Sequence, residues 1–124
     1  MPAIKEAAQE IGSSYGAQVE MHHYEPLFKD MRQDKQLLNL FKDVMTEFGE
    51  SPRILPDDEA DGSTDVGNVS YEVPTAQPTL QIGLGLEVHT PEFTCAAGSD
   101  YGLDQAIKGA KIMAVVALRY AMCK

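Results

Sequence analysis

The sequence predicts a mixed α/β fold in which the elements alternate as helix, strand, helix, strand, helix. Three observations predict it. Apolar residues recur at helical spacing in residues 2–13, 35–48 and 102–122. Apolar and polar residues alternate in residues 17–24, as in a strand with one buried face. A short apolar run with glycines, residues 79–86, is typical of a buried strand.

The amino-terminal segment predicts a helix followed by a strand. Pro2 suits the first position of a helix because its missing N–H has no partner there. The apolar residues of this helix are Ile4, Ala7, Ala8 and Ile11. In the strand, the residues expected on one face are Val19, Met21 and His23.

A second module is predicted to begin near residues 25–32, because Pro26 interrupts any continuing strand. Asp34 is expected to cap a helix over residues 35–48, and Gly49 to end it. The apolar stripe of this helix comprises Leu37, Leu38, Leu40, Phe41, Val44, Met45 and Phe48.

The second half of the chain predicts a polar loop, a buried strand and a buried helix. Residues 50–62 are polar and contain at most a short strand at 53–55. Glycine within the strand 79–86 indicates close approach of another backbone or a ligand. Residues 102–122 are apolar on nearly all faces, which is typical of a helix buried on every side. Gly109 within it suggests tight helix packing.

Composition excludes some classes of function. The 124 residues carry a formal net charge of −9, and a field of that sign repels nucleic acid. No apolar run approaches a membrane span, and the acidic amino terminus does not resemble a signal peptide. Cys95 and Cys123 have no motif spacing, so we expect small buried thiols in a cytoplasmic protein.

The small number of strands predicts a partner. Two strands far apart in sequence cannot shield their own edges, and a two-stranded sheet is marginal alone. The chain is therefore expected to self-associate, most simply as a homodimer, or to pack against a missing amino-terminal half of a larger protein.

Two histidine sites and one polar tripeptide are the candidates for chemistry. His22 and His23 would point to opposite faces of a strand and cannot chelate one metal together. Ser63, Thr64 and Asp65 precede "VGN", where Asp65 is expected to cap a helix. The alternative is a buried carboxylate that orients an active-site group.

His89 is the sharpest candidate, because it directly follows the predicted strand at its carboxyl end. Ligands collect at that end of strands in α/β sheets, and neutral imidazole is a common metal ligand. Spacing alone favours an ordinary strand-end residue, since no second ligand stands at a standard distance in the sequence.

A family resemblance enters at these residues. "GSTDVGNVSYEVPTAQPTLQIG" (62–83), "HTPEFTCAAGS" (89–99) and the apolar closing helix resemble the end of the zinc-dependent aminoacylase-type amidohydrolases and metallopeptidases. The aminobenzoyl-glutamate-utilisation and aminoacylase-like branch is the nearest in pattern. "YEPL" at residues 24–27 resembles the return from the lid domain of that family to its catalytic domain.

The resemblance implies a two-domain zinc-peptidase architecture. Residues 1–28 would be the tail of the lid, or dimerisation, domain, and residues 29–124 the carboxy-terminal part of the catalytic domain. Enzymes of the family use two metal ions to hydrolyse amide bonds of N-acyl amino acids or small peptides. His89 maps to the last metal ligand. Ser63, Thr64 and Asp65 map beside the site, Asp65 as a carboxylate behind it.

The departures from the family pattern bear on activity. The chain has no His-x-Asp and no Glu-Glu motif, and Gln77 stands where relatives often carry histidine. An activated water and a base to take its proton are both required for zinc hydrolysis. We therefore expect a hydrolase segment that is inactive alone. The resemblance implies zinc or another divalent metal in the parent family, with low occupancy at His89 in this chain by itself.

Two alternatives remain open. One is a free-standing homodimeric binding or scaffold module that retains the scaffold without catalysis. The other is a self-sufficient enzyme that shares a metal across a dimer through His22, His23 and His89.

Overall fold

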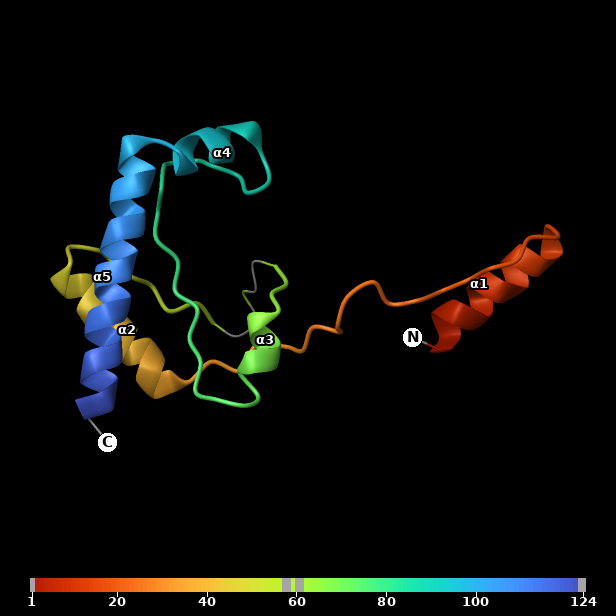
Figure 1. Ribbon diagram of the computed structural model, residues 1–124, viewed down its shortest axis with the longest axis horizontal. Coiled ribbons are helices and arrows are strands. Elements are labelled where there is room, and N and C mark those ends of the chain that lie inside the picture. Colours follow the sequence, from red (N-terminus) through yellow and green to blue (C-terminus); the bar gives the residue numbers. More distant parts are fainter. Residues whose placement is uncertain (1, 57–58, 60–61, 123–124) are drawn as a thin grey trace.

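The computed structural model describes residues 2–56, 59 and 62–122, and over these residues the chain is all-α (Figure 1). The five helices of this part are α1 (Pro2–Ser14), α2 (Lys35–Glu47), α3 (Val66–Val69), α4 (Pro91–Ala97) and α5 (Asp100–Met122). No strand occurs within the same residues. The predicted mixed α/β fold is therefore wrong, although the three long helices were predicted.

The predicted strands are irregular because they have no partner. In residues 17–24 the one backbone hydrogen bond is donated by Ala17 to the carbonyl of Gly12, within the end of α1. Residues 79–86 make no backbone–backbone hydrogen bond in the described chain, and 53–55 are likewise not a strand. Alternation of apolar and polar residues is compatible with a β-strand. The strand forms only when a neighbouring segment pairs with it through backbone hydrogen bonds.

Helix α1 confirms the helix predicted over 2–13, and it lies apart from the other helices at the end of an extended segment (Figure 1). It contacts none of them. Gly12 is buried because the chain folds back after α1, and a Cβ there would lie 2.3 Å from Cγ2 of Val19. The apolar side chains of Ile4 and Ile11 remain exposed.

The core lies between α2 and α5. Asp34 caps α2 as predicted, since its Oδ1 accepts a hydrogen bond from the backbone N–H of Leu37 at 2.8 Å. Gly49, with φ 82°, ends the helix in the left-handed conformation. Among the described residues, the buried apolar side chains are Val44, Met45, Ile112 and Val116, and Val44 is fully buried. This core is small for a chain of 124 residues.

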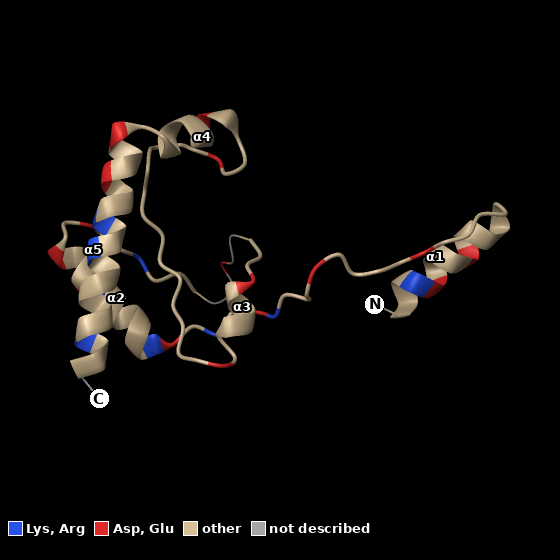
Figure 2. Ribbon diagram, in the orientation of Figure 1, with Lys and Arg blue, Asp and Glu red and all other residues tan. Residues whose placement is uncertain are grey.

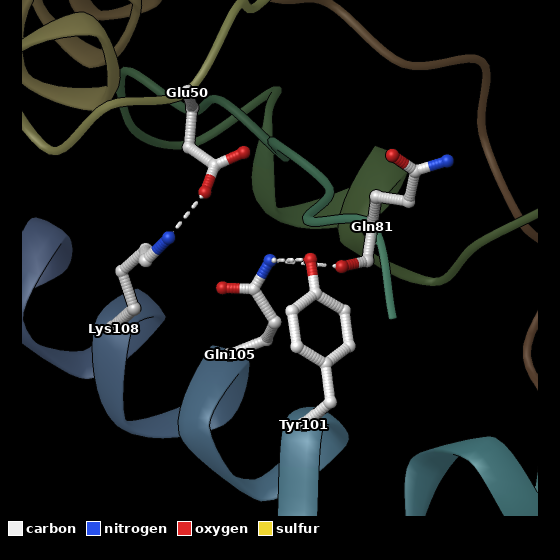
Figure 3. Close-up of polar contacts among 5 residues, drawn as sticks. All are labelled: Glu50, Gln81, Tyr101, Gln105 and Lys108. Carbon is white, nitrogen blue, oxygen red and sulfur yellow. Dashed lines mark hydrogen bonds and ion pairs between the residues drawn. The ribbon is translucent and has the colours of Figure 1, made fainter. Parts of the chain in front are cut away.

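Two ion pairs join α5 to α2 and to the turn that follows α2. Arg119 donates from both Nη atoms to the carboxylate of Glu47, at 2.7 and 2.8 Å. This bidentate hydrogen bonding holds the pKa of Glu47 below its ordinary value. Lys108 Nζ lies 2.6 Å from Oε1 of Glu50, as Figure 3 shows. The Arg119–Glu47 pair holds α2 against α5, and the Lys108–Glu50 pair holds the turn after α2 against the same helix.

Helix α5 is buried on one face only, so the prediction of burial on all sides is wrong for this chain. Ile112 and Val116 face α2. The rest of the helix surface leaves large apolar side chains in solvent, among them Leu103, Ile107, Leu118 and Met122. In the described part of the chain, no helix is long and apolar enough to cross a membrane.

Helix α4 was not predicted, although its signals are local. Thr90 caps it, with Oγ1 accepting from the N–H of Phe93 at 3.2 Å, and Pro91 occupies the first turn. The helix packs on the beginning of α5, where a Cβ at Gly102 would lie 2.3 Å from the carbonyl oxygen of Ala96. That close approach allows the sharp turn between α4 and α5.

Candidate functional site

The polar tripeptide before α3 has a structural role different from the one predicted. Asp65 is exposed and its side chain caps nothing, so that prediction is wrong. The reason is its helical backbone (φ −69°, ψ −16°), because a capping side chain acts from an extended residue. Oγ1 of Thr64 accepts from the N–H of Val66 at 3.3 Å instead, and Ser63 is exposed.

Helix α3 is fastened to the segment at residues 27–34. Oδ1 of Asn68 accepts from the N–H of Lys29 at 2.8 Å, and its Nδ2 donates to the carbonyl of Leu27 at 3.1 Å. The N–H of Arg32 donates to Oγ of Ser70 at 2.9 Å. Gly67 is buried against the carbonyl of Lys29. This docking brings together residues about forty positions apart, and no local sequence signal indicated it.

Tyr71 is the centre of a charged cluster beside α3. Its hydroxyl donates to Oδ1 of Asp30 at 2.6 Å. The guanidinium of Arg32 lies 3.8 Å from the ring centroid, and Nζ of Lys29 lies 4.5 Å from it. The hydrogen bond from Tyr71 holds the pKa of Asp30 below its ordinary value, and the same bond raises the pKa of Tyr71.

Replacing Tyr71 with phenylalanine is expected to raise the pKa of Asp30 toward its ordinary value of 3.8. The ring and its contacts with the cations remain, so the change isolates the hydroxyl. A carboxyl whose folded pKa is depressed stabilises the fold above its unfolded pKa, and that contribution is lost as pH falls through the folded value. The substitution should therefore reduce the acid dependence of stability below about pH 4.

Carboxyl-carbon NMR titration of Asp30 measures this directly. Tyr15→Phe is the matched control, because Tyr15 is exposed and distant in sequence from the cluster. An unchanged Asp30 titration in Tyr71→Phe would contradict the assignment of the hydrogen bond.

His89 lies in the turn before α4, exposed to solvent, with φ 64°. Within the described chain it is the sole residue other than glycine with positive φ. Oγ1 of Thr90 donates to the carbonyl of Glu87 at 2.7 Å while also capping α4. The turn and the cap together hold the histidine in this uncommon conformation.

The candidate residues do not form one site. Helices α3 and α4, which follow Asp65 and His89, make no contact with each other. Nowhere in residues 2–56, 59 and 62–122 do three His, Cys, Asp or Glu side chains gather in a way that could hold a metal ion. The described residues therefore do not fit a complete metal centre.

The remaining candidates are scattered over the surface. His22 and His23 are exposed in the extended segment after α1. Cys95 is exposed on α4, so its predicted burial is wrong, and Cys123 lies outside the described residues. Gln77 is exposed.

An apolar cavity of about 350 Å³ lies between α2, α5 and the extended residues 78–82. Gln105 contributes to its wall and is only 3% exposed. Its Nε2 donates to the carbonyl of Gln81 and to the hydroxyl of Tyr101, both at 2.9 Å, as Figure 3 shows. The apolar wall residues include Phe41, Met45, Leu80, Ile82, Ile112 and Met113. The cavity suits an apolar side chain or ligand group and offers no nucleophile or base.

The nature of these segments becomes clearer by comparison with known proteins. The chain is peptidase-like over part of its length. It is 44% identical over 57 residues to the Xaa-Arg dipeptidases of Homo sapiens and of Mus musculus. The match covers 46% of this chain and 13% of each dipeptidase, so the chain corresponds to a small part of these relatives.

The comparison supports a peptidase-like origin without singling out the aminobenzoyl-glutamate-utilisation branch. No model of a known protein family matches the chain, and no solved structure matches it.

Proposed function

We propose that this chain is a carboxy-terminal segment of a metal-dependent amidohydrolase or peptidase that cleaves amide bonds of N-acyl amino acids or small peptides. The similarity to Xaa-Arg dipeptidases supports the hydrolase class. The segment is proposed to be inactive alone. Its sequence has no His-x-Asp motif to complete a metal centre and no Glu-Glu motif to provide a base.

The conformation of His89 is the observation that carries this proposal. A residue other than glycine with positive φ is uncommon, and such strained positions cluster at functional sites. The imidazole is exposed and held by a capped turn, so it is free to meet a group supplied by another part of the protein. We propose His89 as one zinc ligand of the completed site.

The roles of the neighbouring tripeptide are part of the same proposal. Asp65 would orient a ligand from behind, and Ser63 and Thr64 would form the wall of the site. The lid-tail role of residues 1–28, the catalytic-domain role of 29–124 and the cytoplasmic location remain predictions.

A chimeric enzyme tests the proposal. Residues 62–122 of this chain would replace the corresponding segment of human Xaa-Arg dipeptidase, followed by measurement of Xaa-Arg dipeptide hydrolysis and bound zinc. His89→Asn is the decisive variant, since asparagine tolerates positive φ and removes only the imidazole. It should lower kcat/KM by more than about a hundredfold, because even groups that merely support a ligand are worth 10–100-fold.

Glu87→Gln serves as the matched control in the same turn, since the turn uses only the carbonyl of Glu87. A folded, active chimera that keeps its rate and zinc after His89→Asn would refute the role of His89. A chimera that folds but is inactive even without a substitution would count against the proposal that this segment comes from a hydrolase of this kind.

The chain alone should neither hydrolyse dipeptides nor bind stoichiometric zinc. Metal analysis of the purified chain and of its His89→Asn variant measures this. One equivalent of zinc that disappears in the variant would favour the self-sufficient enzyme instead.

The alternative of a homodimeric module without catalysis is favoured by one observation, the exposed apolar face of α5. Light scattering separates a monomeric segment from such a dimer.

A further inference from the structure

Helix α5 carries an apolar seam on the side that faces solvent. The spacing between successive seam residues alternates between four and three positions. The seam comprises Leu103, Ile107, Ala110, Ala114, Ala117 and Ala121. All six are exposed, and Leu103 and Ile107 keep 54% and 55% of their surface in solvent. Steps of four and three are the spacing by which one helix packs along another.

The seam lies opposite the face that packs on α2. Ile112, buried at 2% exposure, is at the centre of that inner face. At 100° per residue, Ile112 projects about 180° away from Leu103 and Ala121. The seam is thus unobstructed by α2, and its four alanines allow a second helix to approach closely.

Charges beside the seam are asymmetric along the helix. Figure 2 shows acidic residues at the beginning of α5 and basic residues farther along. Asp100 and Asp104 are exposed near the beginning, and Lys111 is exposed near the middle. Lys111 forms no ion pair within the described chain, unlike Lys108 and Arg119, which pair with α2 and its end. Such an arrangement complements itself when two copies lie antiparallel.

The charges also select a register. With Ile107 opposite the partner's Ala110, Leu103 meets the partner's Ala114, and the contact uses these four positions of the seam. Ala117 and Ala121 lie beyond the partner's Leu103. Asp104 then lies within about 3 Å, along the axis, of the level of the partner's Lys111. By symmetry this pair forms twice. A register with Ala110 opposite the partner's Ala114 would pair all six seam positions. It would, however, bring the two Lys111 side chains together, and their like charges would repel.

We propose that α5 of one copy pairs antiparallel with α5 of a second copy through this seam, with Asp104 of each copy beside the partner's Lys111. The pairing covers Leu103 and Ile107, two of the large apolar side chains of α5 that the small core leaves exposed. It gives the homodimer alternative named above a specific interface, and it neither needs nor supplies a catalytic group.

Light scattering of the purified chain at increasing concentration tests the proposal. The wild type should reach twice the mass of a 13.6 kDa monomer. Ala110→Glu combined with Ala114→Glu keeps helix propensity but places charges in the seam. It should weaken the dimer roughly a hundredfold or more. Ala7→Glu in α1 is the matched control, since Ala7 is exposed on a separate helix and should leave the dimer intact.

A charge exchange tests the register. Asp104→Lys and Lys111→Asp should each weaken the dimer roughly three- to tenfold, because exposed ion pairs contribute little singly. The double exchange should restore it. Circular dichroism must show unchanged helix content in each variant.

Three outcomes would overturn the proposal. The first is a wild type that stays monomeric at millimolar concentration. The second is a dimer that tolerates both glutamates. The third is a double exchange no tighter than the single variants, which would refute the stated register.

Discussion

Aspartate in place of Val44 is expected to separate α2 from α5. Val44 is fully buried, with 0% of its surface exposed, in a core that has four buried apolar side chains among the described residues. A carboxylate at that point would lack any partner, since the surrounding side chains are Met45, Ile112 and Val116. The loss should be about 4 kcal/mol or more of unfolding free energy, which a core of this size cannot sustain.

Urea unfolding followed by circular dichroism measures the effect. Val73→Asp is the matched control, because Val73 is the same residue type with half of its surface in solvent. The control should shift the midpoint little. Equal midpoints for Val44→Asp and Val73→Asp would mean that the α2–α5 core does not stabilise the fold.

Alanine in place of Gly67 is expected to release α3 from residues 27–34. A Cβ at Gly67 would lie 2.1 Å from the carbonyl oxygen of Lys29 and 3.1 Å from its carbon. Both are backbone atoms, so no flexible side chain can move aside. The helix must shift, at a cost of roughly 1–3 kcal/mol of unfolding free energy. The hydrogen bonds that Asn68 and Ser70 accept from Lys29 and Arg32 would then be lost.

Amide hydrogen exchange at Lys29 and Arg32 reports on the docking. The N–H of Lys29 donates to Asn68 in α3, and the N–H of Arg32 donates to Ser70 directly after it. They should lose protection in Gly67→Ala and keep it in Gly98→Ala. Gly98 is a fair control because φ is −88° there and the nearest atom to its Cβ would be 3.7 Å away. Protected amides in Gly67→Ala would show that α3 tolerates the methyl group.

Some failures of prediction came from contacts that the sequence does not encode locally. The Tyr71–Asp30 bond joins residues 41 positions apart, so no motif could have predicted it. The backbone of His89 was also unforeseen, because positive φ is usual for glycine and uncommon for a residue that carries a Cβ. Helix α4 is different. Thr90 and Pro91 are ordinary start signals, and the sequence was sufficient to find it.

By itself the sequence determined the three long helices and the cap at Asp34, because helix hydrogen bonds and caps join residues three or four positions apart. Only the tertiary structure decided three other features. Residues 17–24 and 79–86 stay irregular, since a strand needs a ladder from a distant segment. Contact with α2 determines which face of α5 is buried. The sequence could not predict that face, because α5 is apolar on nearly all sides. The separation of α3 from α4 is likewise determined by long-range contacts, because α4 packs on α5 and α3 does not contact α4.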